Sequence, residues 1–191
     1  NHLAFCDSEG KSRVVRVYQP DDNKIIKIGD KEIPGVEYAT PEAIAKLTTD
    51  YDGESHGTHT SAIAVATKIG AYSGMAPECD VVLCGLGEDL SDTALLNAID
   101  YVFTYAESVG KPAVVNLSIG DHIGAHDGTS EVCRAMDALS SDGRIIVAAV
   151  GNEGDVLMHF STKFANVGSS VEQKAVVLTD YDFGGGFYES L

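Results

Sequence analysis

Basic side chains are scarce in this sequence. Lysine and arginine together number 13, against 29 aspartates and glutamates, which gives a formal net charge of −16 at pH 7. A surface of that charge repels phosphate groups, so we expect neither nucleic acid nor an anionic membrane as a partner. Long apolar runs are missing too. No stretch approaches the roughly 20 residues that span a bilayer, and no basic start followed by an apolar run marks a secretory signal.

Cysteine is sparse as well. The four residues, Cys6, Cys79, Cys84 and Cys133, include no pair with the close spacing of a zinc knuckle or a redox motif. Cys79 and Cys84 lie in an apolar run, where free cysteine behaves as a small buried hydrophobe, but the sequence leaves the disulfide status of all four open. The surplus of carboxylates would suit Ca²⁺, which prefers oxygen ligands. No calcium site can be assigned from the sequence, and no cofactor is required for the function inferred below.

Apolar periodicity predicts strands and helices that alternate along the chain. Residues 12–18 are rich in β-branched side chains and indicate a strand. Residues 19–55 are polar and interrupted by proline and glycine, which predicts a long loop or local insertion with a hairpin and a short helix at 41–47. The later elements are a helix from His56 that stops at Gly70, a strand at 80–86, a helix capped by Ser91 or Asp92 and ended by Gly110, a strand at 113–119, a helix from Ser130 to about Ser140, and a strand at 144–150.

This alternation predicts an α/β fold with a doubly wound parallel sheet and helices on both faces. Strands so uniformly apolar suit a parallel sheet that is covered on both sides. After Gly154 the helical spacing stops, and β-like stretches such as residues 174–179 follow. We therefore expect residues 1–160 to form one partial domain with a loop insertion at about 19–55, and residues 161–191 to begin a β-rich inserted segment.

Three short motifs place reactive or polar residues where such residues can act. Ser55-His56-Gly57-Thr58-His59 opens a helix, whose first turn holds a histidine on a fixed backbone, as a general base requires; we expect Gly57 to let another backbone approach closely. Residues 115–120 (Val-Asn-Leu-Ser-Ile-Gly) and 147–154 (Val-Ala-Ala-Val-Gly-Asn-Glu-Gly) each end a strand, at the edge where ligands bind in open α/β sheets. Asn152 offers an amide donor that can stabilise an oxyanion. Taken singly, each motif also fits a purely structural role.

Together, the motifs resemble the subtilase family, the subtilisin-like serine proteases, in order and rough spacing across residues 55–154. The resemblance implies that His56 is the general base and Asn152 the oxyanion-stabilising asparagine. It also implies that Ser118, Ile119 and Gly120 present backbone to a polypeptide substrate. Two further segments support it: Gly74-Met75-Ala76-Pro77 matches the family's Gly-x-Ala-Pro, and Asp127-Gly128-Thr129-Ser130 looks like a subgroup that includes clostridial germination proteases.

Two members of the family's catalytic triad have no match in residues 1–191. His2-Leu3-Ala4-Phe5 resembles the stretch that follows the catalytic aspartate, so we expect that aspartate upstream of Asn1. The nucleophile's Gly-Thr-Ser-Met-Ala-x-Pro has no counterpart, because the Gly-Thr-Ser at 128–130 precedes Asn152 and Ser130 is explained as a helix N-cap. Since the triad acts as a unit, the chain alone should be inactive. Peptide-bond hydrolysis is expected of a parent serine endopeptidase.

Two alternatives remain open. A subtilase-fold pseudoenzyme that serves as a binding or scaffolding module would also lack triad residues. A zinc enzyme would use His56 and His59 with His122 and His126, although the sequence has no His-Glu-x-x-His. The resemblance implies a secreted or extracytoplasmic location, because members of the family commonly act outside the cytoplasm. The incomplete sheet implies association as a homo-oligomer or with a missing fragment.

Overall fold

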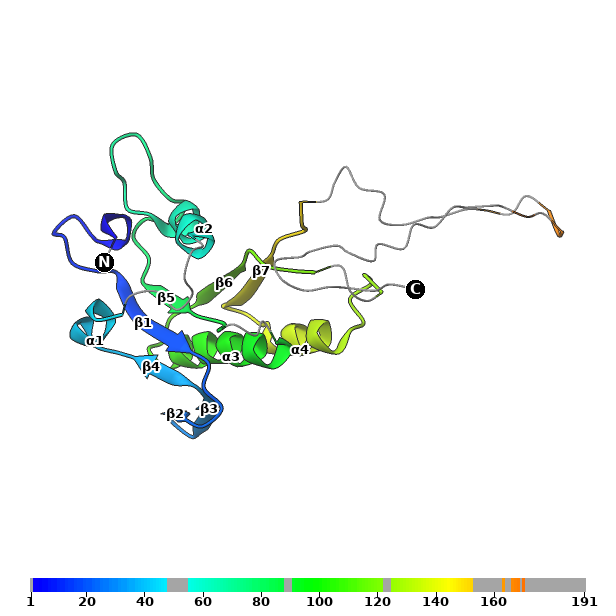
Figure 1. Cartoon of the computed structure of the whole chain (residues 1–191), viewed down its shortest axis with the longest axis horizontal. Coiled ribbons are helices and arrows are strands. Elements are labelled where there is room, and N and C mark those ends of the chain that lie inside the picture. Colours follow the sequence, from blue (N-terminus) through cyan, green and yellow to red (C-terminus); the bar gives the residue numbers. More distant parts are fainter. Residues whose placement is uncertain are drawn as a thin grey trace.

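The computed structural model describes residues 2–47, 55–87, 91–121 and 125–152, together with residue 163, residues 166–168 and residue 170. Helices and strands alternate along these ranges, as the periodicity predicts (Figure 1). In chain order the elements are η1 (Leu3–Phe5), β1 (Val14–Gln19), β2 (Ile25–Ile28), β3 (Lys31–Pro34), β4 (Val36–Tyr38), α1 (Pro41–Ala45), α2 (His56–Val65), β5 (Val81–Cys84), α3 (Asp92–Ser108), β6 (Ala113–Leu117), α4 (Glu131–Leu139) and β7 (Arg144–Ala148).

The strands form three separate hydrogen-bonded groups. β1 pairs in parallel with β5 and antiparallel with β4, β2 and β3 form a hairpin, and β6 pairs in parallel with β7. Within the described residues no ladder joins β5 to β6, although α3 connects these two strands as a crossover helix. In Figure 1, α2 lies on one side of the parallel strands β5 and β6, and α3 and α4 lie on the other. The predicted α/β class with parallel strands is confirmed.

The core lies where the β2–β3 hairpin and β1 meet α3. Tyr18 of β1 and Tyr101 of α3 are fully buried, and their rings stack with centroids 4.9 Å apart. Ile26 and Ile33 complete the cluster from the hairpin. The turn between these two strands has Gly29 at its first central position with φ +59°, the conformation that a two-residue hairpin turn favours there. The predicted hairpin in the 19–55 segment is thus confirmed, and β4 is an additional short strand.

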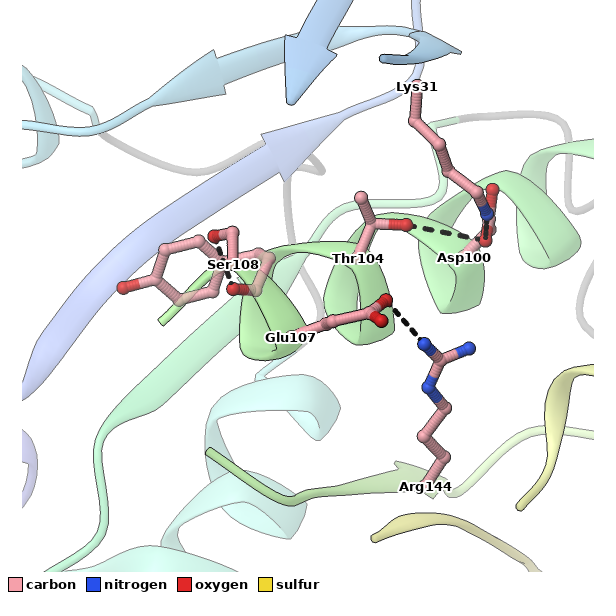
Figure 2. A network of polar contacts seen from close by, with 7 residues as sticks. Lys31, Asp100, Thr104, Glu107, Ser108 and Arg144 are labelled. Atoms are coloured by element: carbon pink, nitrogen blue, oxygen red, sulfur yellow. Dashed lines mark hydrogen bonds and ion pairs between the residues drawn. The ribbon is translucent and has the colours of Figure 1, made fainter. Parts of the chain in front are cut away.

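Helix α3 begins at a side-chain cap and carries two surface ion pairs. Ser91 Oγ accepts a hydrogen bond from the Ala94 N–H, so Ser91 is the N-cap that the sequence left open between two residues. Figure 2 shows Asp100 paired with Lys31 of the hairpin at 2.5 Å, and Glu107 paired with Arg144 of β7 at the same distance. The helix therefore contacts both the insertion and the second pair of parallel strands, but such exposed pairs contribute little stability.

Two expectations differ from the structure. Helix α2 ends at Val65 and not near Gly70, because Ala66 is extended (ψ 135°) and the Thr67 N–H donates to Ala4 O at 2.8 Å. The strands β6 and β7, expected to be covered on both faces, expose Val114 (65%), Ile145 (52%) and Val147 (51%). One face of this pair is therefore open. The predicted β-rich segment 161–191 lies almost wholly outside the described residues, so it stays a prediction.

The length and polarity of the helices bear on membrane insertion. Among the residues that the structure describes, no helix is long and apolar enough to cross a bilayer.

Candidate active site

His56 is the first residue of α2, and its side chain is exposed. The residue before it, Ser55, makes no side-chain cap bond, so the first turn is held from within the helix. There the Thr60 hydroxyl donates to His56 O at 3.1 Å. An exposed imidazole on the fixed backbone of a helix start is placed as a general base requires.

The other end of α2 is held by a loop that follows it in sequence. Three backbone hydrogen bonds join residues 74–76 to the last turn and the C-cap of the helix: Gly74 N–H to Ala66 O at 2.8 Å, Met75 N–H to Ile63 O at 3.2 Å, and Ala76 N–H to Ala64 O at 2.9 Å. These carbonyls have no partner inside the helix, and the loop satisfies them. The Gly-x-Ala-Pro segment at 74–77 thus has a structural role, because its backbone N–H groups cap the C-terminal end of α2.

Gly74 is the residue that allows this close approach. A Cβ built at Gly74 would lie 2.3 Å from Ala66 N and 2.7 Å from Val65 C. Gly57 behaves differently, because a Cβ there would meet nothing within 4 Å. The expectation that Gly57 admits a neighbouring backbone is therefore wrong within the described residues, and the close contact occurs at the opposite end of the same helix.

The parallel pairing of β6 and β7 sets the positions of the other predicted site residues. Leu117 lies opposite Ala148, and the Ala149 N–H donates to Leu117 O at 2.9 Å, so both strands end at one edge. Residues 118–120 follow β6 directly at that edge, and Asn152 lies four residues beyond the end of β7. The Asn116 side-chain amide donates to the Ser118 hydroxyl at 3.0 Å.

A large open concavity is lined both by His56 and by part of this strand edge. Its volume is about 1420 Å³, and residues from α2, β5, α3, β6 and β7 line it, among them His56, residues 82–86, Asn116, Ser118 and Ile119. Gly120 and Asn152 are both exposed and are not among the lining residues. The structure therefore groups His56 with Ser118 and Ile119, and the roles predicted for all five site residues remain predictions.

Cys84 also lines the concavity. Burial raises the pKa of Cys84 to about 12, so the group stays a thiol, which is far less reactive than a thiolate. All four cysteines lie in described ranges, and none forms a disulfide.

The zinc alternative requires a cluster of metal ligands around His56, His59, His122 and His126. Among the residues that the structure describes, no group of three or more histidine, cysteine, aspartate or glutamate side chains could hold a metal ion. His122, one of the four histidines of the zinc alternative, lies outside the described residues.

Comparison with known proteins identifies the class to which this arrangement belongs. A model of the Subtilase family matches residues 27–178, and the chain belongs to that family. It is 28% identical over 121 residues to thermitase of Thermoactinomyces vulgaris, covering 62% of this chain and 41% of thermitase. It is 29% identical over 136 residues to the major intracellular serine protease of Bacillus subtilis, covering 67% of this chain and 37% of that protein.

The fold has a solved counterpart in the same class. The CspB protease of Clostridium perfringens superposes with a TM-score of 0.61 at 25% identity, over 81% of this chain and 34% of that chain. The chain thus spans about a third of that structure and between 29% and 41% of the curated relatives' lengths. The resemblance drawn from the motifs is confirmed as family membership and as a subtilisin-like fold.

Proposed function

We propose that this chain is part of the catalytic domain of a serine endopeptidase that hydrolyses peptide bonds in polypeptides. The observation that carries the proposal is the grouping of His56, at the start of α2, with Ser118 and Ile119 around one concavity. Family membership supports the same reading. Residues 1–191 contain no match to the serine or aspartate motifs, so the proposal assigns the activity to a parent protein that supplies both.

In the proposed mechanism, His56 takes the proton of a serine hydroxyl and later returns it to the leaving amine. The Asn152 amide donates a hydrogen bond to the oxyanion as negative charge develops on the substrate carbonyl. The residues after β6, Ser118 to Gly120, offer backbone groups that pair with a peptide strand. These roles require β6 and β7 to end at the same edge. The two strands do so, because Leu117 lies opposite Ala148.

The test uses the parent protein with a fluorogenic peptide substrate. We expect His56→Gln to lower kcat by about 10⁴-fold or more, and Asn152→Ala to lower kcat by about 10²- to 10³-fold with little change in KM. His59→Gln is the matched control, because His59 lies three residues further along α2 and is also exposed. It should keep wild-type turnover.

Two results would overturn the proposal. Full turnover in the His56→Gln variant would remove the general base. A parent protein that binds peptides without cleaving them would instead support the pseudoenzyme alternative. Extracytoplasmic location remains a separate prediction, since one relative is named an intracellular protease. Association with a further segment or a second copy is also still a prediction, which the open face at Val114, Ile145 and Val147 supports.

A further inference from the structure

Arg13, just before β1, is a buried arginine whose hydrogen bonds converge on the end of the helix that begins with His56. Its side chain is only 8% exposed. The guanidinium donates from Nε to Thr67 Oγ1 at 3.0 Å, from Nη1 to Cys79 O at 2.8 Å, and from Nη2 to Ala4 O at 3.3 Å and to Val65 O. Three segments, at Ala4, at residues 65–67 and at Cys79, therefore meet on one side chain.

The chemistry of this contact is unusual for a buried charge. Buried cations are normally paired with a carboxylate, yet none of the ion pairs found in the described ranges includes Arg13. Three backbone carbonyls and one hydroxyl satisfy it instead. The Val65 carbonyl belongs to the last residue of α2, where the helix dipole is negative and a cation is favourable. Lysine could not replace this pattern, because its three donors radiate from a single point and not from a planar fork.

Helix α2 depends on this end because little else fixes it. None of its residues is fully buried, and its N-terminus has no side-chain cap. The loop 74–76 satisfies the carbonyls of Ile63, Ala64 and Ala66, which leaves the Val65 carbonyl to Arg13. The backbone loop and the one arginine together complete the hydrogen bonding at the end of α2.

We propose that Arg13 is a positioning residue that holds α2 and so sets the location of His56; the catalytic consequence rests on the proposed peptidase function. Val65 and His56 are separated by nine helical steps, which is about 13 Å along the axis. A tilt of about 4° around the Val65 end would displace His56 by about 1 Å, and a displacement of that size can lower turnover about 10²-fold.

The experiment measures two quantities in the parent protein carrying Arg13→Gln. The first is amide hydrogen exchange in α2 relative to α3, and the second is kcat and KM for peptide hydrolysis. We expect exchange in α2 to accelerate about 10- to 100-fold while exchange in α3 is unchanged, since hydrogen bonds from a charged group at one helix end are lost. We expect kcat to fall about 10²-fold with KM within about twofold of wild type.

Arg16→Gln is the matched control. Arg16 lies on β1 itself, but its guanidinium stacks over the Tyr105 ring of α3 at 4.5 Å, and its polar contacts are with Glu37, Val15 O and Ala39 O, all outside α2. This variant should leave exchange in α2 and kcat unchanged. Arg13→Lys keeps the charge but not the fork, so it should shift both readouts in the same direction as Arg13→Gln; it replaces that variant if Arg13→Gln does not fold.

Three results would overturn the inference: unchanged exchange in α2, an equal acceleration in α2 and α3, or normal kcat in spite of faster exchange in α2. A parent protein without peptidase activity would count against the proposed function. The exchange comparison would then still decide whether Arg13 holds α2, because it needs no substrate.

Discussion

Replacing Gly74 by alanine tests the packing of the 74–76 loop against the end of α2. The added Cβ would lie 2.3 Å from Ala66 N, whereas ordinary contacts begin at about 3.5 Å. The obstructing atoms belong to the backbone, so no side chain can turn aside, and the loop and helix must separate by about 1 Å. The three hydrogen bonds that join them, now 2.8 to 3.2 Å long, would then exceed hydrogen-bonding distance.

The expected loss of stability follows from these three bonds. Each backbone hydrogen bond contributes about 1 kcal/mol net, and the substitution recovers about 0.4–1 kcal/mol by restricting the unfolded chain. We therefore expect Gly74→Ala to lower the free energy of unfolding by about 2–3 kcal/mol. Urea denaturation followed by far-UV circular dichroism measures the change, and hydrogen exchange at Met75 and Ala76 reports where it occurs.

Gly57→Ala is the control, since Gly57 lies in α2 itself and an added Cβ there meets nothing within 4 Å. Alanine there should leave stability unchanged or raise it by up to about 1 kcal/mol, because alanine favours helix. If Gly74→Ala cost less than about 1 kcal/mol, or if Met75 and Ala76 kept their protection, the loop would not be seated on α2 as described and the reasoning would be refuted.

Three other substitutions test separate features. Tyr18→Phe removes the bond from the hydroxyl to Pro34 O, and burial, with Cys84 and Asp22 nearby, raises the pKa of Tyr18 to about 12. The folded state therefore holds this proton more tightly than the unfolded chain, so wild-type stability should fall as pH rises from about 10 to 12. In urea titrations, the difference in free energy of unfolding between wild type and Tyr18→Phe at pH 7 should shrink across that range. Tyr101→Phe removes the 2.8 Å bond to Glu37 and should cost about 1–2 kcal/mol in the same assay; no loss would mean that water replaces the bond. Ser130→Ala should cost about 1 kcal/mol as a lost N-cap but leave parent peptidase turnover unchanged, and a loss of turnover would reassign Ser130.

Local patterns were sufficient for most of the elements and for their order. The capping residue Ser130 and the apolar spacing along residues 92–108 predicted α4 and α3, because both signals act within a few residues. The end of α2 was placed too late, since the apolar run continues beyond Val65 while a distant hydrogen bond to Ala4 O turns the chain away. Tertiary contacts outweighed helix propensity there.

In the candidate site, too, local motifs predicted some residues and tertiary contacts decided others. His56 was found from its motif, and its place at the first residue of a helix followed from the sequence. Arg13 and the role of Gly74 were missed. The signal available for Arg13 was a charged residue immediately before a β-branched strand, and such a residue is more often exposed than buried. The hydrogen bonds that bury Arg13 include those to Thr67 and Cys79, which lie 54 and 66 positions away in the sequence.

By itself, then, the sequence determined the alternation of strands and helices, the resemblance to subtilases and the residues to examine. Periodicity and short motifs depend on neighbours along the chain, so they can be read without a structure. Only the tertiary structure decided which surfaces meet: the hydrogen bonds of Arg13 to three segments, the backbone contact at Gly74, the open face of β6 and β7, and the concavity shared by His56 and Ser118. These depend on distances between parts of the chain that the sequence separates, and packing alone sets such distances.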